Sequence, residues 1–79
     1  MIYYFEKDNR FYILELSADI FGKPCIVKTW GSLKSKWERK AEVPVEEGLD
    51  PKEAILQLVA KRKDRGYSLI QKQEHHHPS

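Results

Sequence analysis

Asp50-Pro51-Lys52-Glu53 decides the fold, because it marks the start of a helix in a chain that is otherwise rich in strand formers. Asp50 can accept a hydrogen bond as the N-cap residue, Pro51 fits the first helical position, and Glu53 can reach back to the cap backbone. Cations then precede Gly66, a residue suited to a left-handed C-cap. The sequence therefore predicts one amphipathic helix between these signals, and its apolar stripe contains Ala54, Ile55, Leu58 and Val59.

Four segments before the helix have the composition of β-strands. Residues 2–7 and 11–16 are rich in aromatic and branched side chains and flank Asp8-Asn9-Arg10, which predicts a hairpin. Pro24 follows a loop over residues 17–23 and opens a third strand over 25–30, and residues 37–43 alternate as a fourth. The side chains expected to face the core are Tyr12, Leu14 and Leu16 in the second strand and Trp37, Ala41 and Val43 in the fourth.

The length of the chain limits it to one domain with one core, since it has 79 residues. Tyr67–Ile70 is apolar enough to add a last strand or to pack over the core. We therefore expect an α+β fold, a small antiparallel sheet of four to five strands with one helix packed across it, over residues 1–70. Residues 71–79 are expected to form a flexible tail, and its run His75–His77 lacks the spacing of a metal site, so no metal or cofactor is expected.

Cysteine usage and hydropathy indicate where the protein works. Cys25 is the single cysteine and has no disulfide partner, which is typical of a reducing compartment. The N-terminus shows no basic leader, and the longest apolar runs fall far below the roughly 20 residues of a membrane span. We expect a cytoplasmic monomer that does not enter membranes.

Charge alternates along the chain although the net charge is only +2. Residues 28–40 and 61–65 are basic, and the stretch between them is acidic. Such a pattern can give a dipolar surface whose positive side attracts a polyanion. The alternatives are a solvated surface of mixed charges and, for Lys61–Arg65, charges that complement the helix dipole.

Trp30-Gly31-Ser32 is the motif that bears most directly on function. It places a large aromatic ring beside a glycine and the basic run Leu33-Lys34-Ser35-Lys36. A flat ring next to positive charge suits a nucleic-acid end, since the ring can stack on a base or sugar while lysines meet phosphate. Trp30 could instead close the core at a strand end.

Taken together, these segments resemble the WGR domain over most of the chain. The resemblance is carried by Lys28-Thr29-Trp30-Gly31, by the aromatic strand Asn9–Leu16, by the capped helix after an acidic loop, and by Lys63–Tyr67. It implies a small antiparallel sheet with one helix, in a family found in poly(ADP-ribose) polymerases, where it binds DNA ends, and in bacterial proteins. It also implies that Trp30 lies against a terminal nucleotide and that Gly31 lets the backbone approach. Ser32 stands where the family has arginine, and Lys34 where a second glycine is usual.

Two functions follow from these features, and neither is enzymatic. The first is a non-catalytic module that binds nucleic acid at DNA ends or breaks and does not recognise a base sequence. The second is a protein-interaction module that kept the scaffold, with a patch formed by those of Tyr3, Phe5, Phe21 and Trp37 that are not in the core. The sequence shows no paired carboxylates, no Cys–His pair in the ordered part and no phosphate-binding glycine loop. The candidate nucleic-acid-binding residues are Lys28, Trp30, Gly31, Lys34, Lys36, Arg39 and Lys40, extended by Lys61–Arg65.

Overall fold

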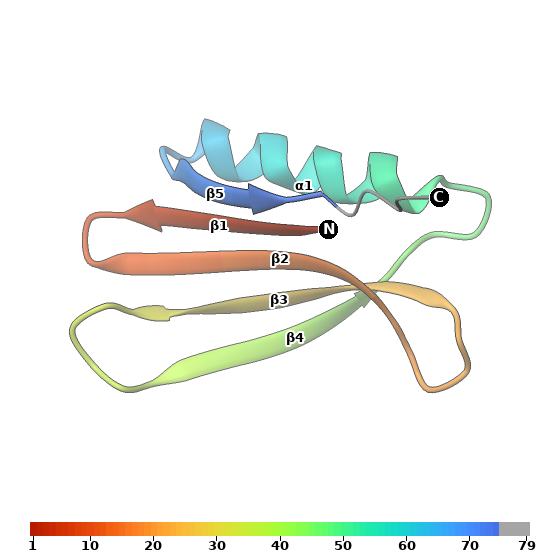
Figure 1. Ribbon diagram of the computed structural model, residues 1–79, viewed down its shortest axis with the longest axis horizontal. Helices are drawn as coiled ribbons and strands as arrows, with labels where there is room; N and C mark the ends of the chain where they lie inside the picture. The colour runs from red at the N-terminus through yellow and green to blue at the C-terminus, as the bar shows by residue number, and fades with distance from the viewer. Residues whose placement is uncertain (75–79) are drawn as a thin grey trace.

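The sheet is built from two hairpins and a returning strand, seen in the computed structural model, which describes residues 1–74 (Figure 1). The strands β1 (Ile2–Lys7) and β2 (Arg10–Ala18) form the first hairpin, and β3 (Pro24–Ser32) and β4 (Glu38–Pro44) the second. After the helix α1 (Pro51–Asp64), strand β5 (Ser68–Gln73) returns to pair with β1. The strand order is β4-β3-β2-β1-β5 and every pairing is antiparallel, so the expected fold class is confirmed.

The residues expected to cap the two ends of α1 are confirmed at Asp50, Pro51 and Gly66. The Asp50 carboxylate accepts a hydrogen bond of 3.0 Å from the backbone N–H of Lys52, and Pro51 is the first helical residue. At the other end, Gly66 has a φ of +91°, a conformation that glycine adopts without strain. The cations Lys61 to Lys63 lie in the last turn, where they favour the negative end of the helix dipole.

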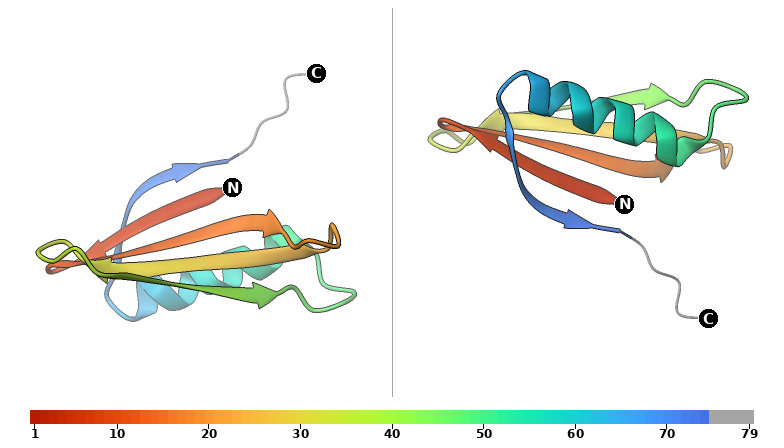
Figure 2. Two further views of the ribbon diagram at one scale, coloured as in Figure 1. Left: turned by 90° about the horizontal axis from the view of Figure 1, so that it is seen from below. Right: turned by 90° about the horizontal axis from the view of Figure 1, so that it is seen from above.

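The core lies between α1 and one face of the sheet, and the other face carries no helix (Figure 2). Its centre is formed by Phe5, Leu14 and Ile55, none of which is exposed to solvent. β4 contributes no buried residue and lies farthest from α1, so the helix-side face of β3 and β4 is partly uncovered. The cluster of buried apolar side chains comprises Tyr3, Phe5, Tyr12, Leu14, Ile26, Ala54, Ile55 and Val59.

Two large apolar side chains are outside the core: Trp37, which was expected to face it, and Phe21, which lies in the predicted loop. Trp37 precedes β4, in the turn after β3, and is 52% exposed, so its place in the alternating pattern was wrong. Phe21 is 80% exposed at the tip of the β2–β3 loop, whereas Tyr3 and Phe5 are buried. Both rings lie in connections, where the strand period no longer sets the direction of a side chain.

The C-terminal strand is longer than the sequence indicated. Gln71, Lys72 and Gln73 pair with Tyr4, Tyr3 and Ile2 of β1, so the folded part extends past the expected boundary at residue 70. Their polar character follows from their position, since β5 is an edge strand and its residues are largely exposed. The His75–His77 run lies outside the described residues.

The single cysteine is inside the third strand, as expected. Cys25 is free and only 4% exposed. Burial raises the pKa of its thiol, and the carboxylates of Glu42 and Asp19 raise it further. The thiolate is therefore disfavoured, which makes this sulfur a poor nucleophile. Within residues 1–74, no helix has the length and apolar character needed to cross a membrane.

Replacing Asp50 by alanine is expected to lower the free energy of unfolding by about 1 kcal/mol, since it removes the cap acceptor for Lys52 N–H. In a domain of this size the midpoint of thermal unfolding should fall by about 4–8 °C, measured by circular dichroism. Asp50→Asn keeps an acceptor oxygen and is the matched control. Equal losses in the two variants would contradict a capping role.

Candidate nucleic-acid interface

Three aromatic rings form a cluster at the end of the sheet where α1 terminates. Tyr12 of β2 and Trp30 of β3 are cross-strand partners, so their side chains leave the same face. Their rings stack with centroids 6.1 Å apart and an interplanar angle of 19°. Tyr67, which follows α1, meets the Tyr12 ring edge-on at 5.9 Å. Trp30 is partly buried by this packing, so it lies at the margin of the core with part of its ring accessible.

Cations from the helix and from β1 hold this cluster. The Arg62 guanidinium carbon is 4.0 Å from the centroid of the Tyr12 ring and 5.5 Å from that of Tyr67. Lys7 places its Nζ 5.8 Å from the Tyr67 ring and donates a hydrogen bond of 2.7 Å to the backbone carbonyl of Arg65. Such cation–π contacts stabilise by about 0.5–2 kcal/mol each. The end of α1 is thereby held over β2, with Arg62 partly buried and Arg65 exposed.

A groove with cationic walls runs between the last turns of α1 and the strands β2 to β4. It consists of two adjoining hollows, of about 320 Å³ and about 160 Å³, which share Tyr12, Lys28 and Arg62. No carboxylate lines either hollow. We call it the cationic groove, and its lining residues are Tyr12, Leu14, Lys28, Trp30, Ala41, Val43, Leu58, Lys61, Arg62, Arg65 and Tyr67.

The charges of the groove are not neutralised within residues 1–74. The ion pair found in that part of the chain joins Lys72 to Glu74 at 3.7 Å, on β5 and beyond it, and no carboxylate there pairs with a groove cation. Burial raises the pKa of the Tyr12 phenol, and Arg62 acts in the opposite direction. The phenol is neutral at physiological pH, so the groove presents four cationic side chains without a compensating anion.

Six of the predicted residues lie on the groove face: Lys28, Trp30 and Arg39 from the sheet, and Lys61, Arg62 and Arg65 from the predicted extension on the helix. Lys28 and Trp30 line the groove itself. Arg39 pairs with Trp30 across the β3–β4 ladder, so its exposed side chain leaves the same face directly beside the ring. These positions share one face because residues two apart in a strand, and directly paired residues, point the same way.

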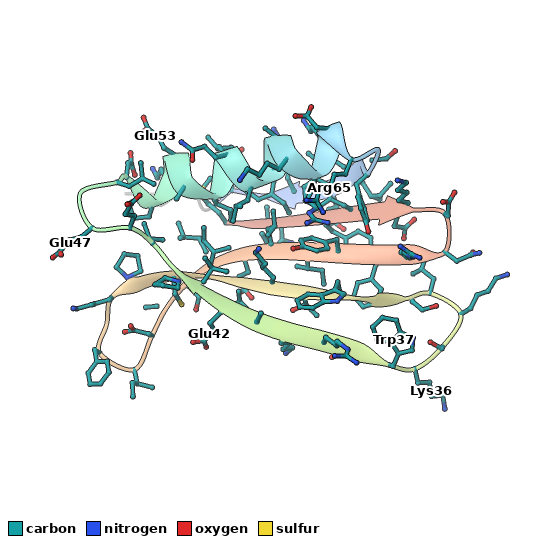
Figure 3. The ribbon with its side chains drawn as sticks, turned by 180° about the vertical axis from the view of Figure 1, so that it is seen from behind. Lys36, Trp37, Glu42, Glu47, Glu53 and Arg65 are labelled. Atoms are coloured by element: carbon teal, nitrogen blue, oxygen red, sulfur yellow. The ribbon has the colours of Figure 1, made fainter. Side chains whose placement is uncertain are left out.

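The other predicted cations lie elsewhere. Lys40 pairs with Thr29, which places it on the opposite face of the sheet. Lys34 and Lys36 are exposed in the turn after β3, and Lys36 points outward from this turn, away from the side on which Arg65 lies (Figure 3). The predicted cations near the motif are therefore divided between the two faces of the sheet and a turn. Of the predicted cations on the sheet, only Lys28 and Arg39 lie on the same face as Trp30.

Gly31 is required by packing on the face away from the groove. A Cβ atom at this position would lie 2.6 Å from the backbone oxygen of Trp37 and 2.9 Å from the ring of Phe11, its partner on β2. Real side chains do not approach that closely, so the protein's own Phe11 and Trp37 occupy the space that the missing side chain leaves. The close approach that Gly31 permits is therefore made by the protein's own residues.

Ser32 also has a local structural contact. Its Oγ accepts a hydrogen bond of 3.1 Å from the backbone N–H of Lys34, which shapes the turn after β3. Arg10 is the cross-strand partner of Ser32, so an exposed guanidinium leaves the groove face beside this serine. Arg10 therefore places a planar cation next to Ser32.

Sequence reasoning missed the contribution of Arg10, Tyr12 and Tyr67 to this site. Tyr12 was assigned to the core on its alternation, which is correct at 6% exposure, yet one edge of it lines the groove. The pairing of β2 with β3 is what brings these residues to Trp30. Register depends on contacts far apart in the sequence, so no local pattern reports it.

The labelled acidic and basic side chains lie in different parts of the molecule (Figure 3). The labelled Glu42, Glu47 and Glu53 lie toward one end, and Arg65 and Lys36 toward the other.

No protein-family model matches the chain, and neither does any curated protein or solved structure. The groove's geometry and charge are therefore the features that bear on function.

Proposed function

We propose that this domain binds nucleic acid through the cationic groove, at ends, nicks or unpaired segments and without reading sequence. The observation that carries the proposal is the stack of Arg62, Tyr12 and Trp30 in a groove lined by four cations and no carboxylate. Unpaired cations beside an accessible aromatic ring are the combination by which proteins hold phosphate and stack a base or sugar. The resemblance to the WGR domain supports the same function.

The size of the groove favours an end over the body of a duplex. Its main hollow of about 320 Å³ falls at the low end of the range for small-ligand pockets. It can therefore receive one base or sugar, while Lys61, Arg65 and Arg39 at its margins meet the adjoining phosphates. These side chains do not lie on a helix or ribbon that projects into the major groove of DNA, where base pairs can be distinguished. The module we propose is non-catalytic and recognises ends, nicks or unpaired segments of the nucleic acid, whatever their base sequence.

Binding should weaken steeply with salt, because each neutralised phosphate releases counterions. With four groove cations engaged, the slope of log K against log salt for duplex DNA should be about −3 to −4, and the affinity should fall roughly 100-fold between 50 and 200 mM salt. Fluorescence anisotropy with a labelled blunt duplex measures both. Failure to bind at low salt, or binding that does not respond to salt, would overturn the proposal.

The choice of probes tests the preference for ends. A covalently closed, relaxed duplex circle, which has neither ends nor unpaired loops, should bind more weakly than the same circle after linearisation, and a nick in the circle should restore the affinity. Single-stranded DNA and RNA of equal length complete the set and compare the two sugars. Equal affinity for the closed, nicked and linear forms would contradict recognition of ends and leave only general phosphate attraction.

A further inference from the structure

The β2–β3 loop holds two large apolar side chains in solvent. Ile20 is 93% exposed and Phe21 80%, and the loop lies at the opposite end of the sheet from the β3–β4 turn (Figure 1). Neither side chain stabilises the core from this position. Burying a side chain of this size in an interface would raise the affinity by about 10- to 150-fold.

The conformation of this loop is fixed by hydrogen bonds. The Asp19 carboxylate accepts bonds of 2.8 Å from the N–H of Phe21 and 2.9 Å from that of Lys23, and the backbone of Asp19 bonds to that of Lys23. Gly22 completes the turn with a φ of +79°. The loop therefore displays its two apolar side chains from an ordered backbone, which lowers the entropy lost when they bind a partner.

A hollow with apolar walls adjoins the loop. It has a volume of about 470 Å³ and begins at Lys23 and Pro24, directly after the exposed pair. Its proline walls are rigid and carry no N–H groups that would need a partner. The apolar residues that line it are Pro24, Pro44, Val45, Leu49 and Pro51.

Negative charge surrounds this surface. Residues 19–24 and 42–53 contain six carboxylates against two lysines. Within residues 1–74 none of these carboxylates forms an ion pair. We call the exposed loop and the hollow together the loop-end surface, made of residues 19–24 and 44–51. Its charge is opposite to that of the cationic groove.

We propose that the loop-end surface docks a protein segment that carries apolar side chains flanked by lysine or arginine. Ile20, Phe21 and the proline-walled hollow receive the apolar side chains, and the surrounding carboxylates select the basic flanks. Charge complementarity of this kind steers association and discriminates between partners. The surface is separate from the cationic groove, so the domain can bind a protein and a nucleic acid at the same time. This inference stands independently of the proposed function.

The test uses three synthetic peptides that differ only in charge or apolarity: RRGLGLGRR, EEGLGLGEE and RRGSGSGRR. Titration of the ¹⁵N-labelled chain with the first peptide should shift amide signals in residues 19–23 and 45–50 and leave those of the cationic groove unchanged. The acidic peptide and the serine peptide should bind at least tenfold more weakly. Equal binding of all three, shifts elsewhere, or no binding by the first peptide would overturn the proposal.

Variants of the exposed side chains separate docking from folding. The double variant Ile20→Ser, Phe21→Ser should bind the first peptide at least about 100-fold more weakly, as expected when two apolar contacts are lost. Leu56→Ser, which removes an apolar side chain that is 48% exposed on α1, is the matched control and should keep the wild-type affinity. The double variant should also keep the affinity for DNA, so the two proposals fail independently.

Two other occupants are distinguished by separate measurements. A second copy would give concentration-dependent dimers in sedimentation equilibrium that the double variant loses. A membrane would give co-sedimentation with phosphatidylcholine vesicles that depends on Phe21. Either result would overturn the proposal of a basic protein segment, whereas a monomer that leaves vesicles in solution and binds the first peptide supports it.

Discussion

Replacing Arg62 by glutamate is expected to lower the affinity for a blunt DNA duplex by about 10- to 100-fold. Arg62 lies between the two hollows of the cationic groove and stacks on Tyr12, so the variant loses a contact to phosphate and places a carboxylate beside Lys28 and Arg65. A hydrogen bond to a charged group contributes about 1.5–3 kcal/mol, and 1.4 kcal/mol is a factor of ten. Fluorescence anisotropy at 50 mM salt measures the loss.

Lys52→Glu is the matched control for this variant. It makes the same change in net charge on the same helix, but at the exposed residue after Pro51, at the far end from the groove. Its affinity for DNA should fall only a few-fold, through the weaker overall attraction. If both reversals weaken binding equally, net charge and not the groove holds the DNA. A third variant, Arg62→Lys, keeps the charge but loses the planar stack, and should lie between the wild type and Arg62→Glu.

The helix could be predicted from its sequence almost to the residue, because its signals are local. Asp50 and Pro51 act on the first turn, and Gly66 acts just beyond the last. Each of these residues works through backbone groups within four positions of itself. The first hairpin was predictable for the same reason, since β1 and β2 are joined by two residues, Asp8 and Asn9, between alternating apolar runs.

The groove could be predicted only in part, because it is assembled by pairing across the sheet. The motif drew attention to Trp30, and its neighbours in sequence suggested Lys34, Lys36 and Lys40 as partners. In the structure the neighbours in space include Tyr12 from β2, which was not predicted at this site, and Arg62 from α1, which was predicted only as an extension of the basic surface. A strand sends adjacent side chains to opposite faces, so sequence proximity is a poor guide to which cations meet a ring.

The two exposed rings show a second limit of local patterns. Trp37 and Phe21 are apolar enough for the core, and composition alone assigns them to it. Phe21 is outside because Asp19 closes the loop by bonding to the backbone on both sides of Gly22. That bond pattern depends on the conformation of the loop, which is visible only in the structure. Phe21 held outside in this way belongs to the loop-end surface, for which we propose a protein partner.

Replacing Phe5 by alanine is expected to lower the free energy of unfolding by about 3–5 kcal/mol, because the Phe5 ring has no solvent exposure and the variant leaves a cavity. A chain of 79 residues has a total stability of roughly 4–12 kcal/mol, so the loss consumes much of it. Urea unfolding followed by tryptophan fluorescence measures the change. The Cys25 thiol, 4% exposed in the folded state, should react faster with a thiol reagent in this variant.

Phe21→Ala removes the same atoms from a ring that is 80% exposed and is the matched control for Phe5→Ala. It should change the free energy of unfolding by no more than about 0.5 kcal/mol, since surface substitutions lose little packing. A large loss would mean that Phe21 packs against the fold in solution and is not free for a partner. A small loss in Phe5→Ala would mean that the space between α1 and the sheet can collapse around the missing ring. Opposite results for the two phenylalanines separate the residue that holds this fold together from the one that it displays.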